Sequence, residues 1–231
     1  MNSHLIEVSD IGKTYPSPAG GVEALKHVSF KVNAGEFVGV VGKSGAGKST
    51  LVNMITGVDT LTSGSIRVGE VEVHQLSEDQ RNVWRGRHVG MVYQSFELLN
   101  QFTLLENITL AMDFCGNYQG KKSVERALHL LEQVEIGAHA YKNPTAISGG
   151  QQQRVAIARA LANDPDIIVA DEPTGNLDSQ TSQTILDLFL SLQKQGKTIF
   201  MVTHNMSLIP AFSKVYQLSD GILSEKKAKK K

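Results

Sequence analysis

Residues 42–49 read Gly42-Lys43-Ser44-Gly45-Ala46-Gly47-Lys48-Ser49, and Thr50 follows them. This stretch matches the pattern Gly-x-x-x-x-Gly-Lys-Ser of a phosphate-binding loop, the P-loop. Its three glycines allow a tightly curved backbone whose successive amide groups point toward one anion. The Lys48 side chain can then reach the β- and γ-phosphates of a nucleotide, and the Ser49 hydroxyl can coordinate Mg²⁺. The stretch therefore predicts a site for nucleotide phosphates.

The flanking segments have the character that such a loop requires. Residues 37–41 form a short, continuous apolar run, which is typical of a strand covered on both faces. Residues 49–57 have helical character, and a helix adds its positive end to a phosphate site. This strand–loop–helix context disfavours the alternative that a glycine-rich turn matches the pattern by accident.

Two carboxylates follow a second apolar run. Residues 167–170 are Ile, Ile, Val and Ala, and Asp171 and Glu172 come directly after them. Ligands of open α/β sheets bind at the carboxyl ends of the strands, where this pair is expected. Alternation along a strand sends the two side chains in different directions. Asp171 can then hold Mg²⁺, directly or through water, while Glu172 can accept a proton from an attacking water.

The rest of the chain predicts an α/β protein. In residues 25–32 the apolar side chains alternate, which indicates a half-buried strand. Residues 96–141 are mainly helical in pattern, with an apolar face. Further β signals lie at residues 65–68, 71–73, 88–93 and 199–202. Because parallel strands need crossover helices, the layout implies an α/β core interrupted by a helical insert.

Composition limits the class of protein. The chain has 231 residues, 41% of them apolar, and one cysteine, Cys115. This cysteine cannot form an intrachain disulfide, which fits a reducing compartment. No apolar stretch approaches the ~18–20 residues that cross a bilayer, and the first residues lack the pattern of a signal peptide. The chain by itself is therefore expected to be soluble.

Charge is balanced overall but unevenly placed. There are 23 basic and 23 acidic residues, and five lysines fall within positions 226–231. The remaining body is mildly acidic and 6% aromatic, which argues against nucleic acid as a partner. We expect the lysine-rich segment 226–231 to be a solvated, disordered tail; weak attraction to anionic lipid is the alternative.

A further motif narrows the class of P-loop protein. Residues 147–151 read Ile147-Ser148-Gly149-Gly150-Gln151, just before the acidic strand. This motif resembles the signature of ABC-type ATPases, which usually begins with Leu, and residues 152–161 continue the resemblance. Ser148 is a favourable helix N-cap, and the glycines let the helix start expose its amides to an anion. GTPases are disfavoured because no Asn-Lys-x-Asp segment is present.

The resemblance implies a fold and an assembly. The fold is a RecA-like P-loop NTPase core with an N-terminal antiparallel β-subdomain and an inserted α-helical subdomain. Residues 1–225 would form this domain, with the insert at about 96–150. ATP and Mg²⁺ are the implied cofactors. Two chains would form a head-to-tail homodimer, with each ATP held between one P-loop and the other chain's residues Ser148, Gly149, Gly150, Gln151 and Asp178.

The resemblance also assigns roles to single residues. Tyr15 resembles the aromatic residue that stacks on adenine, and residues 42–50 contact the rest of the ATP. Gln94 resembles the glutamine that touches Mg²⁺ or water and relays to a membrane subunit. His204 resembles the switch histidine at the γ-phosphate. The implied catalytic residues are Lys48, Gln94, Glu172 and His204, and the implied Mg²⁺ ligands are Ser49, Gln94 and Asp171.

Four segments indicate a branch of the family. Residues 94–99, 105–108, 149–154 and 172–179 resemble the branch that contains lipoprotein-releasing, macrolide-efflux and cell-division ATPases. This branch implies a membrane-embedded permease that grips residues 94–102, and a location at the cytoplasmic face of the membrane. Export or another envelope-directed process would be driven. The alternatives are a regulatory cell-division ATPase, or a soluble ABC protein of translation or DNA repair. Ile147, Lys43 and Glu97 depart mildly from the family pattern.

Overall fold

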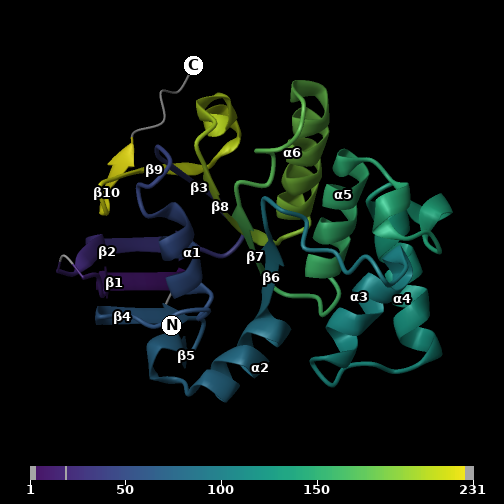
Figure 1. The fold of residues 1–231 in the computed structure, drawn as a ribbon, viewed down its shortest axis with the longest axis horizontal. Coiled ribbons are helices and arrows are strands. Elements are labelled where there is room, and N and C mark those ends of the chain that lie inside the picture. Colours follow the sequence, from purple (N-terminus) through teal and green to yellow (C-terminus); the bar gives the residue numbers. More distant parts are fainter. Residues whose placement is uncertain (1–3, 19, 227–231) are drawn as a thin grey trace.

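The computed structural model describes residues 4–18 and 20–226 (Figure 1). The strands are β1 (His4–Tyr15), β2 (Val22–Asn33), β3 (Phe37–Val41), β4 (Ser63–Val68), β5 (Val71–Glu72), β6 (Val89–Val92), β7 (Ile167–Asp171), β8 (Thr198–Thr203), β9 (Lys214–Ser219) and β10 (Ile222–Lys226). The α-helices are α1 (Lys48–Ile55), α2 (Glu78–His88), α3 (Leu104–Asp113), α4 (Lys121–Gln133), α5 (Gly149–Ala160) and α6 (Ser179–Lys194).

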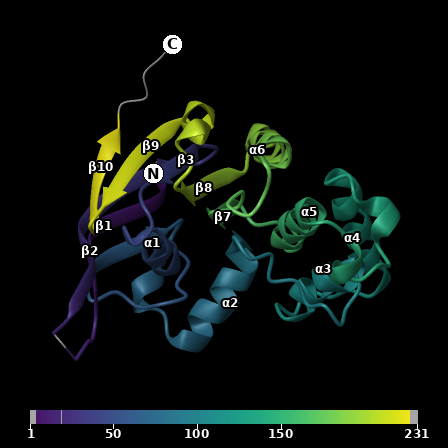
Figure 2. The ribbon, with the colours of Figure 1, turned by 45° about the horizontal axis from the view of Figure 1, so that its top comes forward.

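The larger sheet carries the P-loop. Its strand order is β10-β9-β3-β8-β7-β6, and β3 lies parallel to both β8 and β9. All five residues of β3 are buried, because both faces of this sheet are covered. Phe37 and Val41 pack with α5 and α6, whereas Val38 and Val40 pack with α1 (Figure 2). This double burial explains the continuous apolar run in the sequence.

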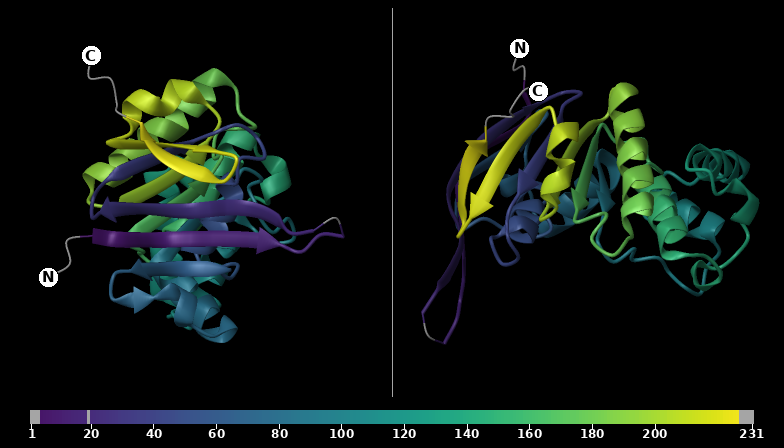
Figure 3. Two further views of the ribbon diagram at one scale, coloured as in Figure 1. Left: turned by 90° about the vertical axis from the view of Figure 1, so that its left-hand side faces the viewer. Right: turned by 90° about the horizontal axis from the view of Figure 1, so that it is seen from above.

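The smaller sheet is antiparallel and has the order β2-β1-β4-β5 (Figure 3, left). Val28, Phe30 and Val32 are buried at alternating positions of β2, as the sequence predicted. They share one core with α1 and with one face of the larger sheet. Helix α1, which begins at the end of the P-loop, is therefore fixed from both sides.

Helices α3 and α4 stand apart from the strands, on the far side of α5 (Figure 3, right). They lie between β6 and β7 in the chain, where the helical insert was expected. Leu131 and Val134 are fully buried, and Val124 and Leu128 pack against the same core. Within the described ranges, none of the helices combines the length and apolar character needed to cross a bilayer.

Several elements differ from the sequence prediction, among them strands β9 and β10, for which no β signal was found. Helix α2 was not predicted, because Trp84 is its only buried residue and its composition is mostly polar. Strand β1 runs from His4 to Tyr15 although only β2 showed a clear alternation. Lys226 belongs to β10, so it is wrong to place it in the lysine-rich tail; the rest of that predicted tail, 227–231, lies outside the described residues.

Candidate functional site

The P-loop links the carboxyl end of β3 to the first residue of α1. Gly45 and Gly47 have φ values of +79° and +102°, in the region that favours glycine. A Cβ at Gly47 would lie 2.6 Å from the carbonyl oxygen of Ala24. At Gly42 a side chain is excluded by close approach: an added Cβ would lie 2.4 Å from the carbonyl oxygen of Leu218. The curvature predicted for this loop is thus confirmed, and each glycine is needed for backbone conformation or close approach.

A pocket of about 1090 Å³ opens beside the loop. Residues 42–50 form one wall of it. Gln94, Glu172 and His204 come from three other parts of the chain and line the same pocket. The turn between β9 and β10 adds a further wall, with Ser219 and Asp220. The fold therefore brings four predicted parts of the site together although they are far apart in the sequence. They are the P-loop, Gln94, Glu172 and His204.

Glu172 lines this pocket and is 8% exposed. Its Oε1 lies 3.2 Å from Nζ of Lys48. Its Oε2 accepts a hydrogen bond from the backbone N–H of His204 at 3.0 Å and lies 2.8 Å from Nδ1 of the same residue. The carboxylate is therefore held between a lysine and a histidine.

The backbone of Glu172 also directs its side chain. Strand β7 ends at Asp171, and Glu172 has a φ of +50°, which is uncommon for a residue other than glycine. Its N–H donates to the carbonyl oxygen of Val202 at 3.0 Å, which fixes this conformation. The left-handed residue comes directly after the strand, where Asp171 is hydrogen-bonded to the Ser49 side chain and Glu172 contacts Lys48 and His204. Strained backbone of this kind concentrates at functional sites.

Lys48 is 6% exposed and its ammonium group has several partners. Nζ donates to the carbonyl oxygens of Gly42 at 3.0 Å and of Lys43 at 2.9 Å. Together with Glu172, these oxygens compensate a charge that burial would otherwise make costly. The same oxygens hold the ammonium group inside the curve of the loop. There it lies beside the backbone amides that would bind an anion.

Asp171 supplies an oxygen suited to a cation. Its Oδ1 is buried and has no hydrogen-bond partner, although its carboxylate is hydrogen-bonded to the Ser49 side chain. Burial raises the pKa of Asp171, against the hydrogen bond from Ser49, and the charge of Glu172 adds to the rise. In the described part of the chain, no cluster of three or more His, Cys, Asp or Glu could hold a metal. A Mg²⁺ ion fits Ser49 and Asp171 because it usually takes one or two carboxylates and completes its shell with phosphates and water.

Ser148 begins helix α5 as the sequence predicted. Its Oγ accepts a hydrogen bond from the backbone N–H of Gln151 at 3.4 Å, and the Gln151 side chain accepts one from the Ser148 N–H at 2.9 Å. This capping box leaves the other first amides of α5 available. Asp178 caps α6 in a similar way, and the two helix starts touch: a Cβ at Gly150 would lie 2.4 Å from Cγ2 of Thr181.

The pocket at the P-loop is not lined by any residue from 148 to 151, nor by Asp178. One chain therefore places the signature motif outside its own P-loop pocket. Tyr15 does not line the pocket either. Its hydroxyl donates to Oδ2 of Asp59 at 2.9 Å and is also hydrogen-bonded to the side chain of Thr50, which does line the pocket. Asp59 was missed from the sequence because no motif links it to Tyr15.

Residues 25–175, more than half of the chain, match the protein family described as ABC transporter. The chain belongs to this family. It is 44% identical over 217 residues to an uncharacterized ABC transporter ATP-binding protein of Thermotoga maritima, covering 94% of this chain and 92% of the relative. It is 41% identical over 220 residues to the lipoprotein-releasing system ATP-binding protein LolD of Pseudomonas fluorescens, with 95% and 96% covered.

Other relatives are longer. The macrolide export ATP-binding/permease protein MacB of Syntrophobacter fumaroxidans is 42% identical over 221 residues, which cover 95% of this chain but only 31% of MacB. Among solved structures, the ATP-binding cassette MJ0796, a dimer in a post-hydrolysis state bound to ADP and Pi, matches with a TM-score of 0.89 and 38% identity. That match covers 98% of this chain and all of the cassette.

These matches confirm the predicted fold, the family and its branch. This ABC chain is an ATP-binding subunit and an ATPase. The relatives' names favour transport over the translation and DNA-repair alternative.

Proposed function

We propose that this ABC subunit hydrolyses ATP to ADP and phosphate at two composite sites of a head-to-tail homodimer and thereby drives a separate permease. The observation that carries the proposal is the Glu172 carboxylate, fixed between Lys48 and His204 in the P-loop pocket. The relatives' names favour transport, in an export or envelope-directed process, over the cell-division role that the sequence also allowed.

The pocket residues take distinct roles in this proposal. Lys48 exchanges its loop carbonyls and Glu172 for the oxygens of the β- and γ-phosphates. Glu172, once released from Lys48, accepts the proton of the attacking water. The His204 side chain is 59% exposed, so its ring can contact the γ-phosphate while Nδ1 holds Glu172. Bound Mg²⁺ would neutralise phosphate charge, held by Ser49, Asp171 and Gln94.

The dimer explains the position of the signature motif. Ser148 and Asp178 cap two neighbouring helix starts, which favour anions through their free amides and positive ends. Because residues 148–151 do not line their own chain's pocket, we infer that they close on the nucleotide of a second chain. The dimeric state of the solved cassette MJ0796 supports this arrangement.

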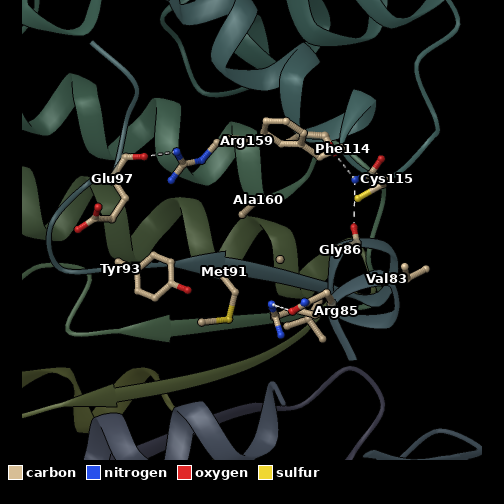
Figure 4. Close-up of a pocket in the computed structure, with 15 residues that line it drawn as sticks. Val83, Arg85, Gly86, Met91, Tyr93, Glu97, Phe114, Cys115, Arg159 and Ala160 are labelled. Carbon is tan, nitrogen blue, oxygen red and sulfur yellow. Dashed lines mark hydrogen bonds between the residues drawn. The ribbon is translucent and has the colours of Figure 1, made fainter. Parts of the chain in front are cut away.

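A second groove, of about 540 Å³, suits the permease (Figure 4). It lies between α2, β6 and the ends of α3 and α5. Glu97 and Tyr93 lie at one end of it, Phe114 and Cys115 at the other, and Met91 between them. We propose that a cytoplasmic helix of the permease contacts this groove and residues 94–102.

The groove has a fixed rim on the side of that segment. Arg159 of α5 donates to the carbonyl oxygen of Phe96 at 3.0 Å and also to that of Glu97. Glu97 has a φ of +50°, which turns the chain at this point. Docking there would place the subunit at the cytoplasmic face of the membrane. Gln94 lines the P-loop pocket, so movement of residues 94–102 would be transmitted through it to the nucleotide.

The Glu172→Gln substitution tests the proposed chemistry. It removes the base but keeps the shape of the side chain, so ATP binding should persist while hydrolysis falls below about a tenth of the wild-type rate. Nucleotide affinity and phosphate release are measured on the same preparation. Hydrolysis above that level would remove Glu172 from the role of general base.

A further inference from the structure

A partly buried cluster ties strand β1 to the segment that follows helix α1. Nζ of Lys13 donates to Oδ1 of Asp59 at 2.9 Å and to the carbonyl oxygen of Thr60 at 2.7 Å. The hydroxyl of Tyr15 donates to the other oxygen of the same carboxylate, Oδ2, at 2.9 Å. Asp59 thus holds two side chains of β1, one with each oxygen. Lys13 is only 8% exposed, while the Asp59 side chain is 33% exposed, so the lysine end of this ion pair is the buried one.

The cluster constrains the ring of Tyr15 from three directions. Asp59 and the side chain of Thr50 both bond its hydroxyl. Nζ of Lys13 lies 4.8 Å from the centroid of the ring and so covers one of its faces. Tyr15 is only partly buried, and a flat partner would stack on the face opposite Lys13.

Electrostatics keep the cluster in the state that holds the ring. Burial alone would raise the pKa of Asp59, but hydrogen bonds from Lys13, from the Thr60 backbone and from Tyr15 lower it below its usual value. Burial and the neighbouring Asp59 raise the pKa of the Tyr15 phenol. At neutral pH, Asp59 is therefore an acceptor and Tyr15 a donor, which is the pairing that the geometry requires.

We propose that Asp59 and Lys13 are positioning residues, which pre-orient the Tyr15 ring as a platform for the base of the nucleotide. This inference rests on the proposed ATP site, and in particular on the role of Tyr15. The connection to that site is Thr50, which touches both the Tyr15 hydroxyl and the P-loop pocket. A ring that is already fixed loses less conformational freedom when a base stacks on it.

The plain alternative is that the cluster only fastens β1 to the P-loop helix. The two roles predict different effects of the substitutions on ligand affinity. A fastening role would affect every ligand of the P-loop, including inorganic tripolyphosphate, which has no base. A positioning role would affect ATP and leave tripolyphosphate unchanged. The ratio of the two affinities is therefore the informative quantity.

Asp59→Ala and Tyr15→Phe are the test variants, prepared in the full chain with Glu172→Gln to prevent turnover. Tyr15→Phe keeps the ring and removes only the hydroxyl, so it remains informative if Asp59→Ala folds poorly. Each variant should weaken ATP binding by about threefold to tenfold, the effect of immobilising one side chain on binding. Tripolyphosphate affinity should not change. The double variant should be no weaker than either single variant, because both remove the same tie.

Asp10→Asn is the matched control, since Asp10 is a carboxylate of β1 that pairs with exposed His27 instead of the cluster. It should leave both affinities unchanged. Equal weakening of ATP and tripolyphosphate in Asp59→Ala would overturn the positioning role. Tyr15→Ala separates the role of Tyr15 from the positioning role of Asp59 and Lys13. If it leaves ATP affinity unchanged, the proposed role of Tyr15 fails; if it weakens ATP binding while Asp59→Ala and Tyr15→Phe do not, only the positioning inference fails.

Discussion

Asp171 and Glu172 are neighbours in the chain but face different surroundings. Glu172 has Lys48 and two groups of His204 as partners, while Oδ1 of Asp171 is buried and has none. An orphaned buried oxygen lowers the stability of the fold, and a bound cation would recover it. We therefore expect Asp171 to destabilise the fold locally when no cation is bound.

Asp171→Asn should stabilise the ligand-free fold at neutral pH and weaken Mg²⁺-dependent ATP binding. Because the pKa of Asp171 is raised in the fold, its ionised form disfavours folding at neutral pH. As pH falls through the raised pKa toward the ordinary value of 3.8, wild-type Asp171 takes up a proton in the fold first, and this penalty disappears. The difference in melting temperature between variant and wild type should thus shrink from pH 7 toward pH 4. A difference that grows on acidification would contradict the assignment.

Helices α5 and α2 start with the same device. Ser148 and Gln151 form a capping box at α5, and Ser77 and Gln80 form one at α2. Removing either cap costs similar stability, because the same backbone donor loses its acceptor. Only the start of α5 belongs to the proposed composite site, so the pair separates folding from function.

Ser148→Ala and Ser77→Ala should each lower the free energy of unfolding by about 1 kcal/mol. Only Ser148→Ala should also reduce ATP hydrolysis, because only Ser148 is expected to contact nucleotide. Chemical denaturation and steady-state hydrolysis, measured on both variants, make the comparison. Equal activity in the two variants would count against a role for Ser148 at the nucleotide.

The elements differ in how far the sequence predicts them. Strand β3 and the P-loop can be predicted from local sequence pattern. Burial on both faces produces a continuous apolar run, and the loop conformation requires three glycines at fixed spacing. Helix α2 is harder to predict from the sequence. It is stabilised by the capping box at Ser77 and by one buried side chain, Trp84, so its sequence shows no apolar periodicity. The Ser77–Gln80 pair was the signal that could have revealed it.

The residues of the candidate site also differ in how far the sequence predicts them. The motif residues were found because each carries recognisable chemistry at a fixed spacing. The bond between Tyr15 and Asp59 spans 44 positions and depends on how β1 docks beside α1, which no local pattern encodes. The left-handed backbone at Glu172, whose N–H bonds the carbonyl oxygen of Val202, was also missed, because no local residue pattern indicates it.

The residues proposed to contact nucleotide lie in two separate places on the molecule. The P-loop, Glu172 and His204 share one pocket, while residues 148–151 lie outside it. A single chain thus offers two incomplete surfaces, and a second chain in opposite orientation would complete both. Because each ATP would then contact both chains, ligand binding would favour association, and Glu172→Gln with ATP should have twice the mass of the monomer.

Crosslinking between two differently tagged chains tests this arrangement most directly. One chain carries Ser44→Cys and the other Gly149→Cys, both with Glu172→Gln and with the single native cysteine removed by Cys115→Ala. Ser44 is preferred to Gly45, whose φ of +79° would strain a cysteine. With ATP and a short thiol crosslinker, we expect a product that contains both tags and does not form without ATP. If the two tagged chains never join, and a chain with both cysteines links only to itself, the composite site does not exist.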